Sequence, residues 1–181
     1  MNINLLQIVN RQHLLPEDFV PCNLVSIGSK GGNHIKLVAV VWDAFMAMSR
    51  AAESYGQSLD IEKGYVSYKE QYLFYYEMMQ KYGEKKILTS VAIPGASEHQ
   101  LGLGIDISSY TLSGLRQKDA DCFKWIHENC HKFGFIVRYK KQFETITGVE
   151  EKPWHLRYVG GWAPSITRLN VPLETFVGKY V

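Results

Sequence analysis

One amphipathic segment, residues 36–55, constrains the fold of this chain more than any other feature. Its apolar residues recur at intervals of three and four, as Val38, Val41, Trp42, Phe45, Met48 and Ala52. This spacing places the apolar side chains on one face of an α-helix, and Gly56 ends the pattern. The apolar run within it contains Asp43 and is too short to cross a bilayer. The segment therefore predicts a helix that packs one face into a globular core.

The rest of the chain predicts a mixture of helices and strands. Apolar runs and weak alternation predict strands at residues 5–9, 24–27, 59–65, 103–107, 135–139 and 156–159. Helical spacing predicts further helices at residues 68–82, 119–133 and, near the C-terminal end, 173–179. Residues 110–118 and 140–152 are expected to be loops. This order favours an α+β fold, in which a small single domain covering residues 1–181 has helices packed on a central antiparallel sheet.

Composition and charge exclude several classes of partner. Apolar residues make up 46% and charged residues 21% of the 181 residues, which is typical of one globular domain with its own core. The net charge of +2 arises from 20 basic and 18 acidic residues that are well mixed along the chain. We therefore expect no nucleic-acid partner and no membrane segment.

The ends of the chain and its cysteines bear on the cellular compartment. The first residues have no basic start, no unbroken apolar run and no small-residue cleavage site, so they do not resemble a signal peptide. The three cysteines, Cys22, Cys122 and Cys130, show no CxxC spacing and are expected to be reduced, buried thiols. We expect a cytoplasmic protein if the chain is full length, and a cell-envelope protein if an anchor or signal was removed.

Two histidines and an aspartate have the character of metal ligands. His99 and Asp106 lie seven residues apart, and His155 follows in the aromatic segment 152–158. Two imidazoles and one carboxylate leave a fourth position open on a tetrahedral Zn²⁺, which is the mark of a catalytic zinc site.

A second pattern, H-E-x-x-H, competes for the same interpretation. His127, Glu128 and His131 fit it on a predicted helix, and Glu151 is placed as a third ligand. The apolar stripe of that helix, however, puts both histidines on its flank, partly toward solvent. We therefore favour incidental surface histidines over a protease site of this type.

The first pattern also resembles that of a known family. Ser97–Asp106 and Pro153–Gly160 resemble the two signatures of the zinc D-Ala-D-Ala peptidases and carboxypeptidases (VanY/VanXY-like, LAS-type metallopeptidases), S-x-H-x-x-G-x-A-x-D and E-P-W-H-x-R-Y-V-G. Gly64–Gln71 resembles the G-Y-R-S-Y-x-x-Q block of that family, and further likeness extends over residues 6–24 and 133–148. The resemblance therefore covers most of the chain.

The resemblance implies both a fold and an activity. It implies a small α+β domain with one Zn²⁺ per chain at the mouth of an antiparallel sheet, held by His99, Asp106 and His155. It also implies a D,D-carboxypeptidase or D,D-dipeptidase that removes terminal D-alanine from D-Ala-D-Ala or from peptidoglycan precursor peptides, as in bacterial cell-wall metabolism and vancomycin resistance. Gln71 and Ser97 match positions near the substrate, and Trp154 and Tyr158 would shape the pocket wall.

Two positions depart from the family pattern. Lys152 occupies the position of the glutamate that takes a proton from the metal-bound water, and Val66 occupies that of the arginine that stabilises charge on the carbonyl oxygen. Glu151, next to Lys152, is a candidate replacement for the base, and Lys152 itself could supply the missing cation. The alternative is a catalytically impaired protein that retains zinc and binds muropeptide ligands.

Overall fold

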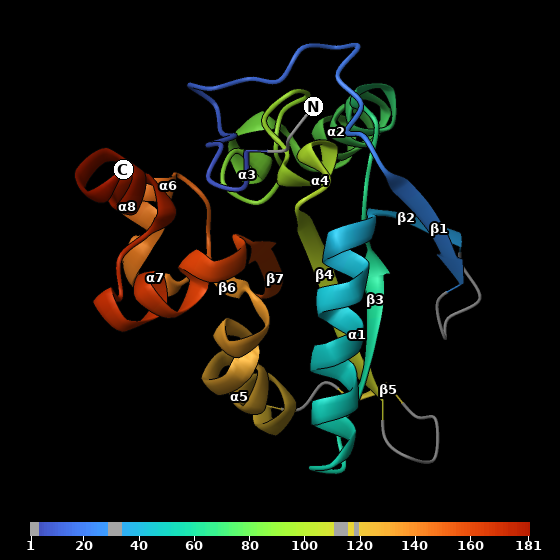
Figure 1. The fold of residues 1–181 in the computed structure, drawn as a ribbon. Helices are drawn as coiled ribbons and strands as arrows, with labels where there is room; N and C mark the ends of the chain where they lie inside the picture. The colour runs from blue at the N-terminus through green and yellow to red at the C-terminus, as the bar shows by residue number, and fades with distance from the viewer. Residues whose placement is uncertain (1–3, 29–33, 111–115, 118–119) are drawn as a thin grey trace.

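The structure is a computed structural model that describes residues 4–28, 34–110, 116–117 and 120–181, with side chains described outside residues 109–122. Its centre is a five-stranded antiparallel sheet (Figure 1). The strands β3 (Ser58–Lys63), β4 (Gly104–Tyr110), β7 (Lys152–Tyr158) and β6 (Phe135–Tyr139) are neighbours in that order, and β5 (Arg116–Gln117) pairs with β4. A separate antiparallel pair consists of β1 (Leu24–Gly28) and β2 (His34–Val38). The α+β fold with an antiparallel sheet is therefore confirmed.

Helices surround this sheet (Figure 1). Those of the described residues are α1 (Ala39–Glu53), α2 (Tyr68–Tyr82), α3 (Glu84–Ile87), α4 (Glu98–Leu101), α5 (Ala120–Asn129), α6 (Glu144–Thr147), α7 (Ala163–Leu169) and α8 (Leu173–Tyr180). Short 3₁₀ turns follow at η1 (Cys130–Phe133), η2 (Lys141–Phe143) and η3 (Gly160–Trp162). None of the described helices has the length and apolarity that a membrane crossing requires.

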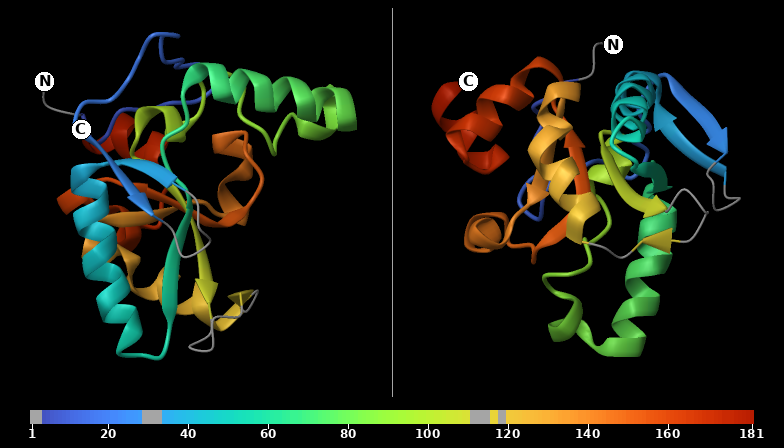
Figure 2. Two further views of the ribbon diagram at one scale, coloured as in Figure 1. Left: turned by 90° about the vertical axis from the view of Figure 1, so that its right-hand side faces the viewer. Right: turned by 90° about the horizontal axis from the view of Figure 1, so that it is seen from below.

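The main core lies between α1 and the sheet. Phe45 and Met48 of α1 are buried in one cluster with Ile61 of β3 and Ile105 of β4. Burying each such side chain contributes roughly 1.5–3 kcal/mol to folding. A second apolar cluster packs α7 and α8 beside β6. The two clusters pack against the central strands, and α2 extends away from them as an arm (Figure 2).

Several predicted boundaries are wrong. Residues 5–9 form a turn at residues 5–6 and irregular chain at residues 7–9 instead of a strand, and residues 36–38 belong to β2 instead of the first helix. In β2 the residues Ile35 and Leu37 are buried while His34 and Lys36 are exposed, so the alternation of a strand overlaps the start of the helical spacing. Residues 36–38 form a strand because they pair with β1.

The two predicted loops contain regular structure. The segment 140–152 includes η2 and α6, and its last residue, Lys152, already belongs to β7. In the segment 110–118, Tyr110 ends β4 and residues 116–117 form β5, while the other residues lie outside the described part of the chain. Lys152 starts a strand because it pairs with Tyr139 of β6, a long-range contact that local sequence does not reveal.

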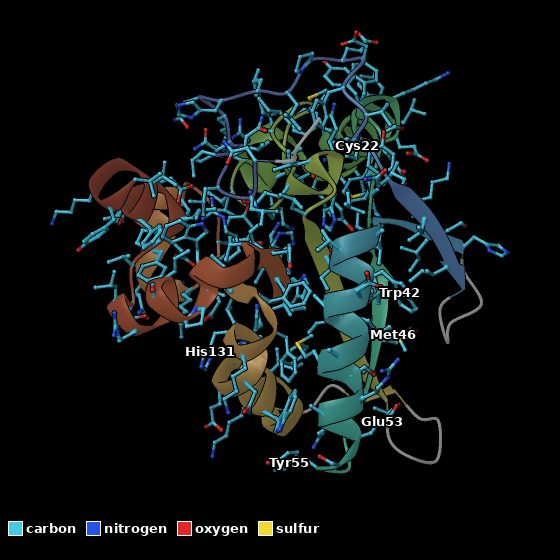
Figure 3. All side chains as sticks on the ribbon, in the orientation of Figure 1. Cys22, Trp42, Met46, Glu53, Tyr55 and His131 are labelled. Atoms are coloured by element: carbon cyan, nitrogen blue, oxygen red, sulfur yellow. The ribbon has the colours of Figure 1, made fainter. Side chains whose placement is uncertain are left out.

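The cysteines differ from one another. Cys130 is buried, as expected, whereas Cys22 is exposed near the end of the molecule where α2 lies (Figure 3). Cys22 follows Pro21 in an irregular segment ahead of β1, where core packing does not cover it. The side chain of Cys122 lies outside the described residues.

Candidate metal centre

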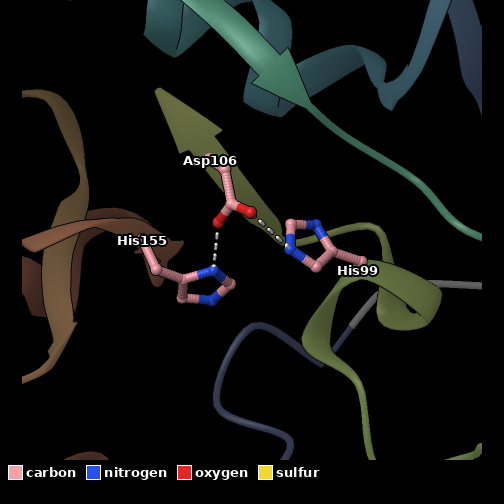
Figure 4. Close-up of side chains that lie close together, drawn as sticks. All are labelled: His99, Asp106 and His155. Atoms are coloured by element: carbon pink, nitrogen blue, oxygen red, sulfur yellow. Dashed lines mark hydrogen bonds and ion pairs between the residues drawn. The ribbon is translucent and has the colours of Figure 1, made fainter. Parts of the chain in front are cut away.

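His99, Asp106 and His155 come together from three elements (Figure 4). His99 lies in α4, Asp106 in β4 and His155 in β7, where His155 is the direct pairing partner of Asp106. Asp106 Oδ1 lies 2.7 Å from His155 Nδ1, and Asp106 Oδ2 lies 3.4 Å from His99 Nε2. One ligand atom from each residue lies within 4.8 Å of the others. Among the described residues, this is the group that could hold a metal ion.

The second nitrogen of each imidazole is oriented by an acceptor. His99 Nδ1 donates to the carbonyl oxygen of Gly64 over 2.8 Å, which leaves Nε2 facing Asp106. His155 Nε2 donates to Glu98 Oε2 over 3.3 Å, which leaves Nδ1 facing Asp106. Metal-binding histidines show this pattern of outer hydrogen bonds, since it fixes both the tautomer and the direction of the ligand atom. The residues present therefore fit a zinc ion.

The charges of this group are strongly coupled. Burial alone would raise the pKa of Asp106, but the His99 and His155 imidazoles hold it well below its usual range. Burial alone would lower the pKa of His155, but its hydrogen bonds to Asp106 and Glu98 raise it. The cluster thus retains a carboxylate that binds positive charge, whether a proton or a metal cation.

A buried network of ions supports His155 from behind. Glu98 is fully buried and accepts hydrogen bonds of 2.7 Å from both Arg138 Nε and Arg157 Nη1. Arg138 also pairs with Glu174 of α8, and Arg157 donates to backbone carbonyls of the N-terminal segment. Burial alone would raise the pKa of Glu98, but the two arginines hold it well below its usual range. Glu98 is therefore a carboxylate already committed to structural partners.

Sequence analysis missed this network, although a signal was present. Arg138 and Arg157 are charged residues inside the apolar strand segments FIVRY and HLRY, and charged residues rarely lie there without a buried partner. Only the fold shows that Glu98, one residue before His99, is that partner.

A cavity of about 180 Å³ adjoins the three ligand candidates. Its charged and polar walls include Lys63, Gln71, Ser90, Ser97 and Lys152, together with Glu98 and the three ligand candidates. Gln71 is held there by a 2.6 Å bond to the Ala92 carbonyl, and the hydroxyl of Ser97 accepts from the backbone amide of His99. These two predicted substrate contacts therefore both line the cavity beside the ligand candidates.

Lys152 and Glu151 point to different environments. Lys152 Nζ lines the cavity and donates a 2.8 Å hydrogen bond to the Ser90 carbonyl. Glu151 is exposed and does not line the cavity, and its backbone amide is bound by Glu144. Neighbouring residues of an extended chain face opposite ways, so Glu151 cannot replace Lys152 without a change in the strand.

Other predicted residues lie outside the cavity. Trp154 is 41% exposed, and Tyr158 packs against Phe135 and Gly134. Val66 donates its backbone amide to the His99 carbonyl and is not among the residues that line the cavity. The aromatic wall is instead provided by Phe74 and Tyr139, which sequence analysis did not select.

The H-E-x-x-H residues form no metal group with one another in the described structure. The Nε2 atom of His127 lies 3.0 Å from the carbonyl oxygen of Pro153, and His131 lies in η1 (Figure 3). His127 therefore supports the strand that carries Lys152 and His155.

Comparisons with known proteins agree with this site. A family model described as VanY, D-alanyl-D-alanine carboxypeptidase, matches residues 34–161. The Bacillus subtilis (strain 168) protein YodJ, named for an inferred carboxypeptidase activity, is 39% identical over 188 residues, covering 97% of this chain and 68% of its own length.

Solved structures share the whole fold. The structure of the LD-carboxypeptidase LdcB, described for its recognition of peptidoglycan, is 37% identical with a TM-score of 0.87 and covers 97% of this chain and 86% of its own. A mutant of the vancomycin-resistance D,D-pentapeptidase VanY in complex with Zn(II) is 31% identical with a TM-score of 0.82. The match covers 95% of this chain and 98% of the VanY chain. The first neighbour is named an LD-carboxypeptidase and the second a D,D-pentapeptidase, so their names describe peptide bonds of different stereochemistry.

Proposed function

Since this chain belongs to the VanY D-alanyl-D-alanine carboxypeptidase family of zinc metallopeptidases, we propose that it binds one Zn²⁺ through His99, Asp106 and His155 and removes D-alanine from peptides that end in D-Ala-D-Ala. The observation that carries the proposal is the convergence of three ligand atoms within 4.8 Å, with both imidazoles oriented from behind. Peptidoglycan precursor peptides are the corresponding substrate class.

The metal would supply an activated water and a Lewis acid for the peptide carbonyl. The chain's own residues would supply the rest of the site. Gln71 and Ser97 would contact the peptide, and Phe74 and Tyr139 would shield it from water. Buried acceptors fix the directions of His99 and His155, so the ligand set needs little rearrangement.

The surroundings of the cavity allow a peptide longer than a dipeptide. A second cavity of about 180 Å³ is lined by Tyr139 and Lys152 as well, and it continues toward Arg11 and the segment 145–149. A ligand whose end lies beside the metal-binding residues could therefore extend past Lys152. This supports carboxypeptidase action on a stem peptide over action confined to the free dipeptide.

One observation favours a second candidate function. The carboxylates that line the cavity are Glu98 and Asp106, and both already have partners in the network and in the ligand set. A protein with Lys152 at the base position could therefore retain zinc and the ligand while releasing little product. Loss of a general base typically lowers the rate by about 10²–10⁴-fold.

The test combines metal content with product release. We expect one zinc per chain by mass spectrometry, lost in His99→Ala and His155→Ala and kept in His34→Ala, which changes an exposed histidine of β2. D-alanine release from a D-Ala-D-Ala-terminated pentapeptide and from the dipeptide would then be measured on the zinc-loaded protein. Folded protein without zinc would contradict the proposal, and peptide binding without D-alanine release would establish the second candidate.

A further inference from the structure

Two lysines reach the same cavity from opposite sides of Asp106. Lys63 lies at the end of β3, where its pairing partner is Asp106 of β4. Lys152 starts β7, the neighbour of β4 on the other side. Both side chains line the cavity beside the metal-ligand candidates. The sheet order β3–β4–β7 thus places two ammonium groups around one ligand-binding space.

A register shift brings Lys152 into this position. Strict alternation along β7 would send Lys152 and His155, three residues apart, to opposite faces of the sheet. The pairing between β6 and β7 shifts between Val137 and Tyr139, and both Lys152 and His155 then line the cavity. Such irregularities often change the direction of a side chain beside a functional site.

Neither lysine has a carboxylate partner of its own among the described residues. Lys152 Nζ donates to the neutral Ser90 carbonyl and lies 5.7 Å from the ring centre of Tyr139. Lys63 Nζ lies 5.1 Å from the ring centre of Phe74. Glu98 is neutralised by two arginines, and Asp106 faces both ligand imidazoles. The described cavity therefore holds more positive than available negative charge, before any metal is added.

Because both lysines are partly buried, a bound anion would stabilise their charges more than it would on the surface. Burial lowers the pKa of Lys63 and of Lys152, and nearby carboxylates (Asp106 for both lysines and Glu150 for Lys152) oppose this only in part. Charges in such a site are screened by salt less than charges on the surface. A carboxylate that accepts hydrogen bonds from two ammonium groups would relieve both.

We propose that Lys63 and Lys152 form an anion clamp, which binds a carboxylate of the ligand in the cavity beside His99, Asp106 and His155. Lys152 keeps one N–H on the Ser90 carbonyl, so two remain for the ligand. The carboxylate is the C-terminal one of a D-alanine-terminated peptide, and this assignment of its source rests on the proposed function. In the family pattern, the position of Lys152 holds the catalytic base. In this chain, the anion clamp gives that position a role in ligand recognition.

The anion clamp can be tested by binding alone. N-acetyl-D-alanine and N-acetyl-D-alaninamide have almost the same shape, and only the first carries a carboxylate. We expect calorimetry on the zinc-loaded protein to show at least a tenfold preference for the acid. In Lys63→Met and in Lys152→Met the preference should fall several-fold, while Lys85→Met, which changes an exposed lysine of α3, should leave it unchanged.

Two controls separate the anion clamp from the proposed function. Zinc content is measured in every variant, so that lost binding is not confused with lost metal, and the preference for the acid is measured again in metal-free protein. Equal binding of acid and amide, no measurable binding of the acid, or unchanged preference in both lysine variants would overturn the anion clamp. Absence of D-alanine release with the acid preference intact would contradict the hydrolytic proposal alone.

Discussion

The ammonium group of Lys152 donates a 2.8 Å hydrogen bond to the backbone carbonyl of Ser90, 62 residues earlier in the chain. The bond holds the side chain against the wall of the cavity that contains His155. An acidic side chain at the same position could not make this bond, because a carboxylate and a carbonyl are both acceptors. A carboxylate there would instead be left for the ligand or for water.

Replacing Lys152 by glutamate should therefore raise catalysis. Lys152→Glu also removes one cation of the anion clamp, so the rates are compared at saturating peptide. Under that condition we expect Lys152→Glu to increase D-alanine release from the pentapeptide by about 10²–10⁴-fold, which is the usual contribution of a general base. Initial rates on zinc-loaded protein would measure it, with Lys141→Glu as a control on an exposed lysine of η2. An unchanged rate, at full zinc content, would show that proton transfer in this site does not depend on residue 152.

Glu98 should dominate the stability of the metal-binding end of the fold. Glu98→Gln leaves the buried Arg157 without its carboxylate partner, while Arg138 keeps Glu174. Breaking a buried ion pair in this way typically costs about 3–5 kcal/mol. Urea unfolding at pH 7 would measure this loss. Glu77→Gln on the exposed face of α2 is the matched control, with an expected change within about 0.5 kcal/mol.

Glu98 should also affect how the free energy of unfolding falls at acidic pH. Burial opposes ionisation of Glu98, but Arg138 and Arg157 hold its folded-state pKa well below its unfolded value of about 4.3. Its contribution is therefore complete above the unfolded pKa and is lost as the pH falls toward the folded pKa. Unfolding free energies measured from pH 6 downward should fall less steeply in Glu98→Gln. Parallel curves would show that Glu98 is not the titrating group.

The sequence predicts best what local interactions decide. The helix α2 matches its predicted bounds, because Ser67 and Glu70 form a capping box at its start and Gly83 ends it. The residue types of the metal centre were also recognisable. The pairing of Asp106 with His155, in contrast, depends on the order and register of strands 49 residues apart, which no local pattern specifies.

Tertiary contacts explain what the sequence did not reveal. Lys152 was expected in a loop, and only its pairing with Tyr139 shows that it belongs to a strand. No sequence pattern marks Lys63 as a site residue, because a lone lysine is usually solvated. Its position opposite Asp106 becomes visible only in the sheet.

Cys130 and Cys22 should differ in reactivity. Burial raises the pKa of the Cys130 thiol to about 12, so almost no thiolate forms at pH 8. We expect an aromatic disulfide reagent to modify the exposed Cys22 within minutes in native protein and to reach Cys130 only after unfolding. Peptide mapping by mass spectrometry distinguishes the two sites, and rapid modification of Cys130 in folded protein would contradict its burial.

Gly64 links the packing of β2 to the direction of a metal ligand. A Cβ atom at this position would overlap the carbonyl oxygen of Lys36 and the side chain of Leu37, so the backbone must move. The Gly64 carbonyl accepts the hydrogen bond from His99 Nδ1, and loss of such an outer contact typically weakens metal binding by about 10–100-fold. We expect Gly64→Ala to show this loss in a competition titration with a zinc chelator.

The matched control for this change is Gly161→Ala, because a Cβ atom there meets nothing within 4 Å. It should bind zinc as the natural protein does. Gly64→Ala is also expected to unfold about 1–3 kcal/mol more easily, the usual effect of overpacking. If zinc affinity stays unchanged while stability falls, the Gly64 carbonyl contributes to packing but does not orient His99. If both fall together, the packing of Gly64 against β2 also supports the metal centre.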